Sequence, residues 1–213
     1  MRGIFVTGTD TEVGKTVVSA SLMNALRETE NVCYWKPIQT GIEEDNDTET
    51  VRNLANCSDA EIHEHGIRLE KPLSPHLSAR LSNYEITIQQ TIDYLPNKTD
   101  DKFWIVEGAG GILVPLNETD LMLDLMRHLR LPVVIAARAG LGTINHTLLT
   151  IETLRSRNLE ILGVIMNGEP NLENKRAIEH YGNVNVLAEV PKFENLNAES
   201  LKNVNINWGI KNA

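Results

Sequence analysis

The residues best suited to chemistry form a glycine-bounded segment, Thr-Gly-Thr-Asp-Thr-Glu-Val-Gly-Lys-Thr, at residues 7–16. Backbone N–H groups of such a loop can surround phosphate oxygens, and the helix that follows adds the positive end of its dipole. Lys15 would reach the outer phosphates, and the Thr16 hydroxyl would bind Mg²⁺. The usual motif has glycine at the position of Thr9, whereas this chain has Gly8. The segment therefore predicts a phosphate-binding loop with a shifted glycine.

Two further charged residues follow apolar runs, where buried strands are expected to end. Lys36 follows residues 32–35, and Glu107 follows residues 103–106 and precedes Gly108-Ala109-Gly110-Gly111. Two lysines beside a phosphate loop can stabilise charge on a transferring phosphoryl group. A carboxylate at a strand end is suited to Mg²⁺, and the glycines permit close approach of a nucleotide. Alone, Lys36 would be an ordinary solvated lysine; its place beside the loop favours a role in the reaction.

Other segments allow both a structural and a functional interpretation. The acidic stretch 43–49 is expected to be mostly a solvated loop, in which Asp47 can serve as the N-cap of the next helix. Residues 140–146 open another helix, so their N–H groups can bind an anion or be capped routinely. Asn167 with Gly168 can read a base edge or form a turn. His76 is interpreted as a structural histidine.

Apolar runs alternate with helix-like patterns along the whole chain. Strands are expected at 4–6, 32–35, 103–106, 133–136 and 161–166, with a weaker one at 184–187, and helices at 15–27, 48–55, 86–95, 121–129, 143–155 and 173–181. Strands with continuous apolar runs are typical of parallel sheets. The pattern predicts one α/β domain over residues 1–213, a doubly wound, mostly parallel sheet of the P-loop NTPase type. Ligands then bind beyond the carboxyl ends of the strands.

Composition narrows the function classes. The formal net charge is −9 and the pI near 5.2, which argues against a nucleic-acid partner because such a surface is basic. No apolar run is long enough to cross a bilayer, and a strand beginning at Gly3-Ile4 leaves no room for a signal peptide. Cys33 and Cys57 form no disulfide or metal framework. The expectation is a soluble, cytoplasmic domain.

Taken together, these segments resemble the dethiobiotin synthetase family, ATP-dependent ligases of biotin biosynthesis. The resemblance runs from residue 3 to about residue 193 and includes the longer glycine spacing of the loop. Its distinctive pieces are Gly8 to Thr16, Lys36-Pro37, Ser74-Pro75-His76, Glu107 to Gly111 and Asn145-His146.

The resemblance implies substrates, a mechanism and site residues. The substrates would be 7,8-diaminopelargonate, CO₂ and MgATP, and the protein would be a homodimer with a shared site. Lys36 and Lys15 would be catalytic, and Thr16, Asp47 and Glu107 would bind Mg²⁺. The nucleotide site would comprise Glu12, Val13, Gly14, Lys15, Thr16, Val17, Asp47, Glu107, Gly108, Ala109, Gly110, Asn167, Gly168, Pro191, Lys192 and Phe193. The diamine would contact Thr40 and, from the partner subunit, the helix start that holds Gly142, Thr143, Ile144 and Asn145.

The main alternative is a partition- or targeting-type P-loop ATPase that acts as a switch. Such loops usually carry an extra lysine five residues before the Gly-Lys-Thr lysine, and this chain has Asp10 there. An amidotransferase-type synthetase of the same loop class would need a glutaminase domain, for which the chain has no room. Both observations favour the synthetase.

Overall fold

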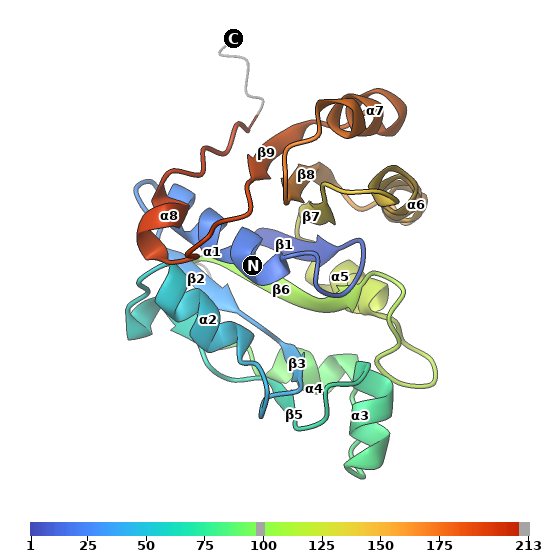
Figure 1. Ribbon diagram of the computed structural model, residues 1–213. Helices are drawn as coiled ribbons and strands as arrows, with labels where there is room; N and C mark the ends of the chain where they lie inside the picture. Colours follow the sequence, from blue (N-terminus) through green and yellow to red (C-terminus); the bar gives the residue numbers. More distant parts are fainter. Residues whose placement is uncertain (97–100, 209–213) are drawn as a thin grey trace.

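A seven-stranded sheet, in which every strand pair is parallel, forms the centre of the molecule (Figure 1). The computed structural model describes residues 1–96 and 101–208. Across the sheet the strands are β4 (Ile62–His63), β2 (Val32–Trp35), β6 (Phe103–Gly111), β1 (Arg2–Gly8), β7 (Val133–Arg138), β8 (Ile161–Asn167) and β9 (Val186–Val190). A small parallel sheet pairs β3 (Ile38–Thr40) with β5 (Ile67–Leu69).

Helices cover both faces of the main sheet, which confirms the doubly wound α/β class. One face packs against α1 (Lys15–Leu26), α2 (Asp47–Leu54) and α8 (Ala198–Lys202), which lie together in Figure 1. The opposite face of the sheet packs against α5 (Met122–Leu129), α6 (Thr143–Ser156) and α7 (Leu172–Gly182). Residues of α3 (Pro75–Leu81) and α4 (Ile88–Asp93) contribute to the same core. A short 3₁₀ helix, η1 (Asp59–Glu61), precedes β4.

Alternate residues of each strand enter different cores. In β1, Ile4 and Val6 belong to the core beneath α1 and α2, while Phe5 belongs to the core on the opposite face. This follows from the two-residue period of a strand, which points successive side chains to opposite faces. Both faces are therefore apolar, as expected of a parallel sheet covered by helices on each side. Trp35 and Trp104 are buried in the core with Cys33.

Two strands differ from their expected bounds. β6 continues through Gly111 instead of ending at residue 106, because Val6 pairs with Glu107 and Gly8 pairs with Gly111 of the neighbouring strand. Glu107 is thus a fully buried strand residue and does not lie in the loop after the strand. The weaker strand expected at 184–187 is shifted and runs over Val186–Val190.

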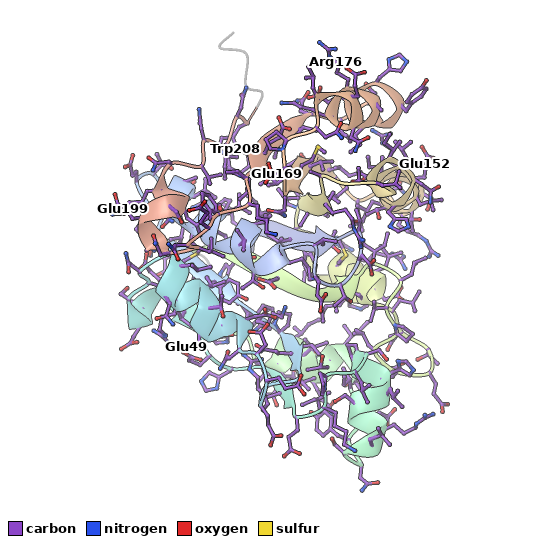
Figure 2. The ribbon with its side chains drawn as sticks, in the orientation of Figure 1. Glu49, Glu152, Glu169, Arg176, Glu199 and Trp208 are labelled. Carbon is purple, nitrogen blue, oxygen red and sulfur yellow. The ribbon has the colours of Figure 1, made fainter. Side chains whose placement is uncertain are left out.

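Charged side chains lie mainly on the outside. Figure 2 shows Glu49, Glu152 and Glu199 pointing away from the ribbon, and all three are exposed. Trp208 is partly buried and packs against the core beneath α1. Within residues 1–96 and 101–208, none of the helices combines the length and apolarity needed to cross a bilayer.

Candidate active site

The predicted phosphate loop connects β1, a central strand, to α1. Its start is attached to the sheet by the Thr9 amide, which donates to Ala136 O at 3.0 Å. Gly14 has φ 84° and ψ 32°, a left-handed conformation that glycine adopts readily, and no side chain caps the helix that follows. The first amide groups of α1 are therefore available to an anion. Lys15 is buried against this loop, with Nζ 3.3 Å from Asp10 O.

A buried cluster of charged and polar groups lies beside the loop. The Lys36 ammonium is 2.7 Å from Asp47 Oδ2, 2.8 Å from Glu107 Oε1 and 3.1 Å from Gly108 O. The Thr16 hydroxyl donates to Asp47 Oδ1 at 2.6 Å and lies 3.3 Å from Glu107 Oε1. Four residues that the sequence places on separate segments thus meet within hydrogen-bond distance, at the carboxyl edge of the sheet.

The same cluster contains two hydroxyl groups that the sequence interpretation missed. Ser19 Oγ and Tyr34 OH donate to Glu107 Oε2 at 2.8 and 3.0 Å, and both residues are fully buried. Ser19 lies one helical turn after Thr16, and Tyr34 lies two residues before Lys36. Both spacings place a side chain on the same face as its functional neighbour. Spacing was therefore the signal that could have identified them.

Electrostatics of the cluster follow from burial and opposite charge. Burial alone would lower the pKa of Lys36, but the Glu107 and Asp47 carboxylates outweigh burial and raise it. Burial would raise the pKa of Asp47, yet the Lys36 ammonium holds it below its usual range. Burial and the nearby charge of Lys36 lower the pKa of Lys15. An added anion beside Lys15 would therefore stabilise the charged form of this lysine.

Asp47 has a different local role from the one considered in the sequence. The N-cap of α2 is Asn46, whose side chain accepts from the Glu49 amide at 3.2 Å. Asp47 is the first residue of the helix, and its carboxylate turns inward to Thr16 and Lys36. The N-cap interpretation of Asp47 is therefore wrong, because the preceding asparagine holds the N-cap position and accepts from the Glu49 amide.

A second part of the candidate site is a cavity of about 300 Å³ on the other side of the phosphate loop. Asn167, at the end of β8, donates through Nδ2 to Val13 O at 2.7 Å, while its Oδ1 is buried without a partner. Arg138, which the sequence interpretation did not single out, pairs with Asp10 at 2.6 Å. The cavity is lined by Glu12, Val13, Gly14, Val17, Arg138, Asn167, Gly168, Val190, Pro191, Lys192, Phe193 and Leu196.

The remaining predicted residues lie on other segments, of which the end of β6 borders the phosphate loop: a Cβ at Gly110 would lie 3.8 Å from Thr11 Oγ1. Thr40 ends β3, and Ala109 and Gly110 lie in the last part of β6. The α6 start has Gly142 as N-cap, with Thr143 and Ile144 turned partly or fully inward and Asn145 exposed. Among the residues that the structure describes, no hydrogen bond or ion pair joins 142–145 to the phosphate loop or to Lys36.

Together, the parallel sheet, the glycine-bounded loop between β1 and α1, and the buried lysines define a P-loop nucleotide-binding protein. A family model described as an AAA domain matches residues 2–200. The septum site-determining protein MinD from Pyrococcus horikoshii OT3, solved with Mg-ADP, is similar in fold, with a TM-score of 0.59 and 17% identity over 94% of this chain and 93% of that chain. At this identity the likeness shows the fold alone.

Relatives with similar sequences identify the family. The ATP-dependent dethiobiotin synthetase BioD of Paramagnetospirillum magneticum is 51% identical over 94% of this chain and 93% of its own length. The protein of the same name from Brucella ovis is 46% identical over 93% of this chain and 90% of its own length. The chain belongs to the dethiobiotin synthetase family.

Proposed function

We propose that the protein uses ATP to close the ureido ring of dethiobiotin from 7,8-diaminopelargonate and CO₂, releasing ADP and phosphate. Membership of the family supports this reaction. The observation that carries it within the molecule is the buried contact of Lys36 with Asp47 and Glu107 beside the phosphate loop. A lysine held at that place is suited to stabilise negative charge as a phosphoryl group is transferred.

The reaction needs positioning and charge stabilisation, with no covalent attachment to the protein. One amine of the substrate adds to CO₂ and loses a proton, which gives a carbamate. A carbamate oxygen attacks the γ-phosphorus of ATP, and ADP leaves. The second amine attacks the carbonyl carbon and loses a proton to solvent, phosphate leaves, and the ring closes. Lys15 and Lys36 stabilise the anionic oxygens, and the amides at the start of α1 hold the phosphates.

Mg²⁺ is assigned to Thr16, Asp47 and Glu107. All three offer oxygen, which Mg²⁺ prefers, and their oxygens converge: Thr16 Oγ1 lies 2.6 Å from Asp47 Oδ1 and 3.3 Å from Glu107 Oε1. A site with two carboxylates suits Mg²⁺ that is also bound by phosphates and water. When bound, the metal would neutralise charge on the phosphates.

The cavity beside Asn167 is assigned to the base of the nucleotide. The buried Oδ1 of Asn167 has no hydrogen-bond partner in the protein. It can accept a hydrogen bond from an exocyclic amino group, such as that of adenine. Pro191, Lys192 and Phe193 form the outer wall beyond β9. The arrangement supports ATP as the nucleotide.

The proposed reaction predicts strict dependence of phosphate release on both small substrates. We expect ADP and phosphate to form in the complete mixture and to fall to background when either the diamine or bicarbonate is omitted, since the γ-phosphoryl acceptor is then missing. A coupled assay of phosphate release measures this. Equal turnover without the diamine would contradict the synthetase proposal and favour a switch ATPase.

The diamine site is assigned to the interface between two copies of the chain. Leu141, directly before the N-cap of α6, is 100% exposed; Leu149, one helical turn after the exposed Asn145 and on the same side of the helix, is 59% exposed. Apolar side chains at this spacing suit a surface that a second subunit covers. The Thr143 amide donates to Gly140 O at 3.2 Å, so the other amides at this helix start would then bind the substrate carboxylate from across the interface.

A charge placed at this helix start should weaken diamine binding alone. Asn145→Asp puts a carboxylate beside the substrate carboxylate, so we expect a raised KM for the diamine and little change for ATP. An anion at a helix start is stabilised by roughly 0.3–2 kcal/mol, which corresponds to a change of about 2- to 30-fold. Steady-state kinetics with each substrate varied in turn measure the two KM values.

Mixed dimers test whether the site is shared. If Asn145→Asp is mixed with Lys15→Ala, each mixed dimer keeps one site with an intact loop and an intact partner helix, so part of the activity should return. Subunit exchange is verified first with differently tagged chains. Complete exchange without recovered activity, or full activity in a dilute monomer, would show that each chain carries its own site.

A further inference from the structure

Glu107 is the most deeply enclosed charged group of the proposed metal site. Its side chain has no exposed surface, so burial must be compensated by hydrogen bonds. The two oxygens are satisfied in different ways. Oε1 contacts the Lys36 ammonium and the Thr16 hydroxyl, whereas Oε2 accepts from Ser19 and Tyr34.

We propose that Tyr34 and Ser19 are positioning residues, which hold Oε2 of Glu107 so that Oε1 faces Thr16 and the metal site. The inference rests on the proposed role of Glu107 as a Mg²⁺ ligand and adds the groups that orient it. Outer hydrogen bonds of this kind commonly fix the direction of a metal-binding carboxylate.

Ser19 departs from the behaviour of serines in helices. A helical serine commonly donates back to the carbonyl four residues earlier, and Ser21 of the same helix does so, with Oγ 2.8 Å from Val17 O. Ser19 instead donates to Glu107 at 2.8 Å. Both serines are buried, so the difference comes from the neighbouring carboxylate and not from exposure.

Tyr34 reaches the same oxygen from the strand next to Glu107. Its ring lies in the core beneath α1 and α2, and only the hydroxyl is directed to the carboxylate, at 3.0 Å. The Tyr34 and Ser19 hydroxyls donate to Oε2 of Glu107, whereas Oε1 makes the contacts with Thr16 and Lys36, so neither hydroxyl engages the groups proposed to hold the nucleotide. Their hydrogen bonds restrain the terminal torsion of the glutamate, which otherwise has a broad preference. Without them, both oxygens could turn toward Lys36.

The test measures how strongly Mg²⁺ improves nucleotide binding. For each variant, calorimetry gives the Kd of β,γ-imido-ATP in EDTA and in saturating Mg²⁺. The Kd in EDTA divided by the Kd in Mg²⁺ is the factor by which the metal improves nucleotide binding. We expect Tyr34→Phe and Ser19→Ala each to lower this ratio by about tenfold or more, the range for loss of outer-shell partners. The Kd in EDTA should change little, since neither residue contacts the nucleotide.

Ser21→Ala is the matched control, because it deletes a buried hydroxyl from the same helix without touching Glu107. Its ratio should equal that of the wild type. If Tyr34→Phe does not fold, Ser19→Ala decides alone. Glu107→Gln separates the metal role of Glu107 from the positioning role of Tyr34 and Ser19. A loss with Glu107→Gln but none with Tyr34→Phe or Ser19→Ala would overturn the positioning role. No loss with Glu107→Gln would overturn the metal role of Glu107 and this inference with it.

Discussion

Replacing Lys36 with methionine is expected to lower the rate of phosphate release by about a hundredfold or more, which corresponds to losing one electrostatic contact to the transition state. The same change should also destabilise the fold. Lys36 is only 3% exposed and bonded to two carboxylates. Removing one partner of a buried ion pair costs about 3–5 kcal/mol. Urea unfolding and the phosphate assay measure the two effects on the same preparation.

A double variant separates chemistry from folding. Lys36→Met with Asp47→Asn removes one of the charges that the methionine leaves uncompensated, so stability should return in part. Asp47→Asn alone already lacks a proposed Mg²⁺ ligand, and we expect the double variant to be less active than this single variant. Lys202→Met, in an exposed pair with Glu199, should leave both properties within about 0.5 kcal/mol of wild type. If the double variant were as active as Asp47→Asn alone while it regained stability, Lys36 would be structural and not catalytic.

The second large effect is expected at Gly14, where the phosphate loop meets the base cavity. A Cβ added there would lie 2.9 Å from Asn167 Nδ2, in a backbone with φ 84°. Gly14→Ala therefore adds left-handed strain of about 1–2 kcal/mol and displaces the side chain that bonds Val13 O, a loss of about 1 kcal/mol. The strain lowers the stability of the fold, whereas the displaced Asn167, which lines the base cavity, predicts nucleotide binding weaker by roughly fivefold.

Gly142 offers the matched control for backbone strain. It has φ 90°, yet an added Cβ would meet nothing within 4 Å. Gly142→Ala should thus reproduce the strain without disturbing Asn167, and its Kd for nucleotide should stay near that of the wild type. Fluorescence titration with a labelled ATP analogue compares the two variants. Equal losses of nucleotide affinity would mean that strain alone explains the effect of Gly14→Ala.

Most of the fold could be predicted because long apolar runs in a parallel sheet leave a clear pattern. Strands β1, β2, β7 and β8 lie where the sequence predicts them. The short strands β3 and β5 of the second sheet did not emerge, because three residues are too few to show a period. The strand order also lay beyond the sequence, since it depends on which crossovers pack together.

Some residues of the candidate site could likewise be identified from the sequence, and others could not. Lys36 and Glu107 were identified because they interrupt apolar runs beside a phosphate loop. The burial of Glu107 was not foreseen, because glycines after it imitate a loop while they in fact continue the strand. Tyr34 was missed because an aromatic residue in an apolar run indicates core. For Asp47 the sequence left a capping role open beside the metal role, because both Asn46 and Asp47 are residue types that can cap a helix.

The base cavity has a consequence for the order in which the protein can be made. Its walls join Val13, near the start of the chain, to residues as late as Leu196, and the Asn167–Val13 hydrogen bond spans 154 positions. A growing chain on the ribosome therefore exposes its phosphate loop long before β9 exists to complete the pocket. Nucleotide can add its binding energy only to the finished fold, so the early strands must persist through synthesis on their own packing.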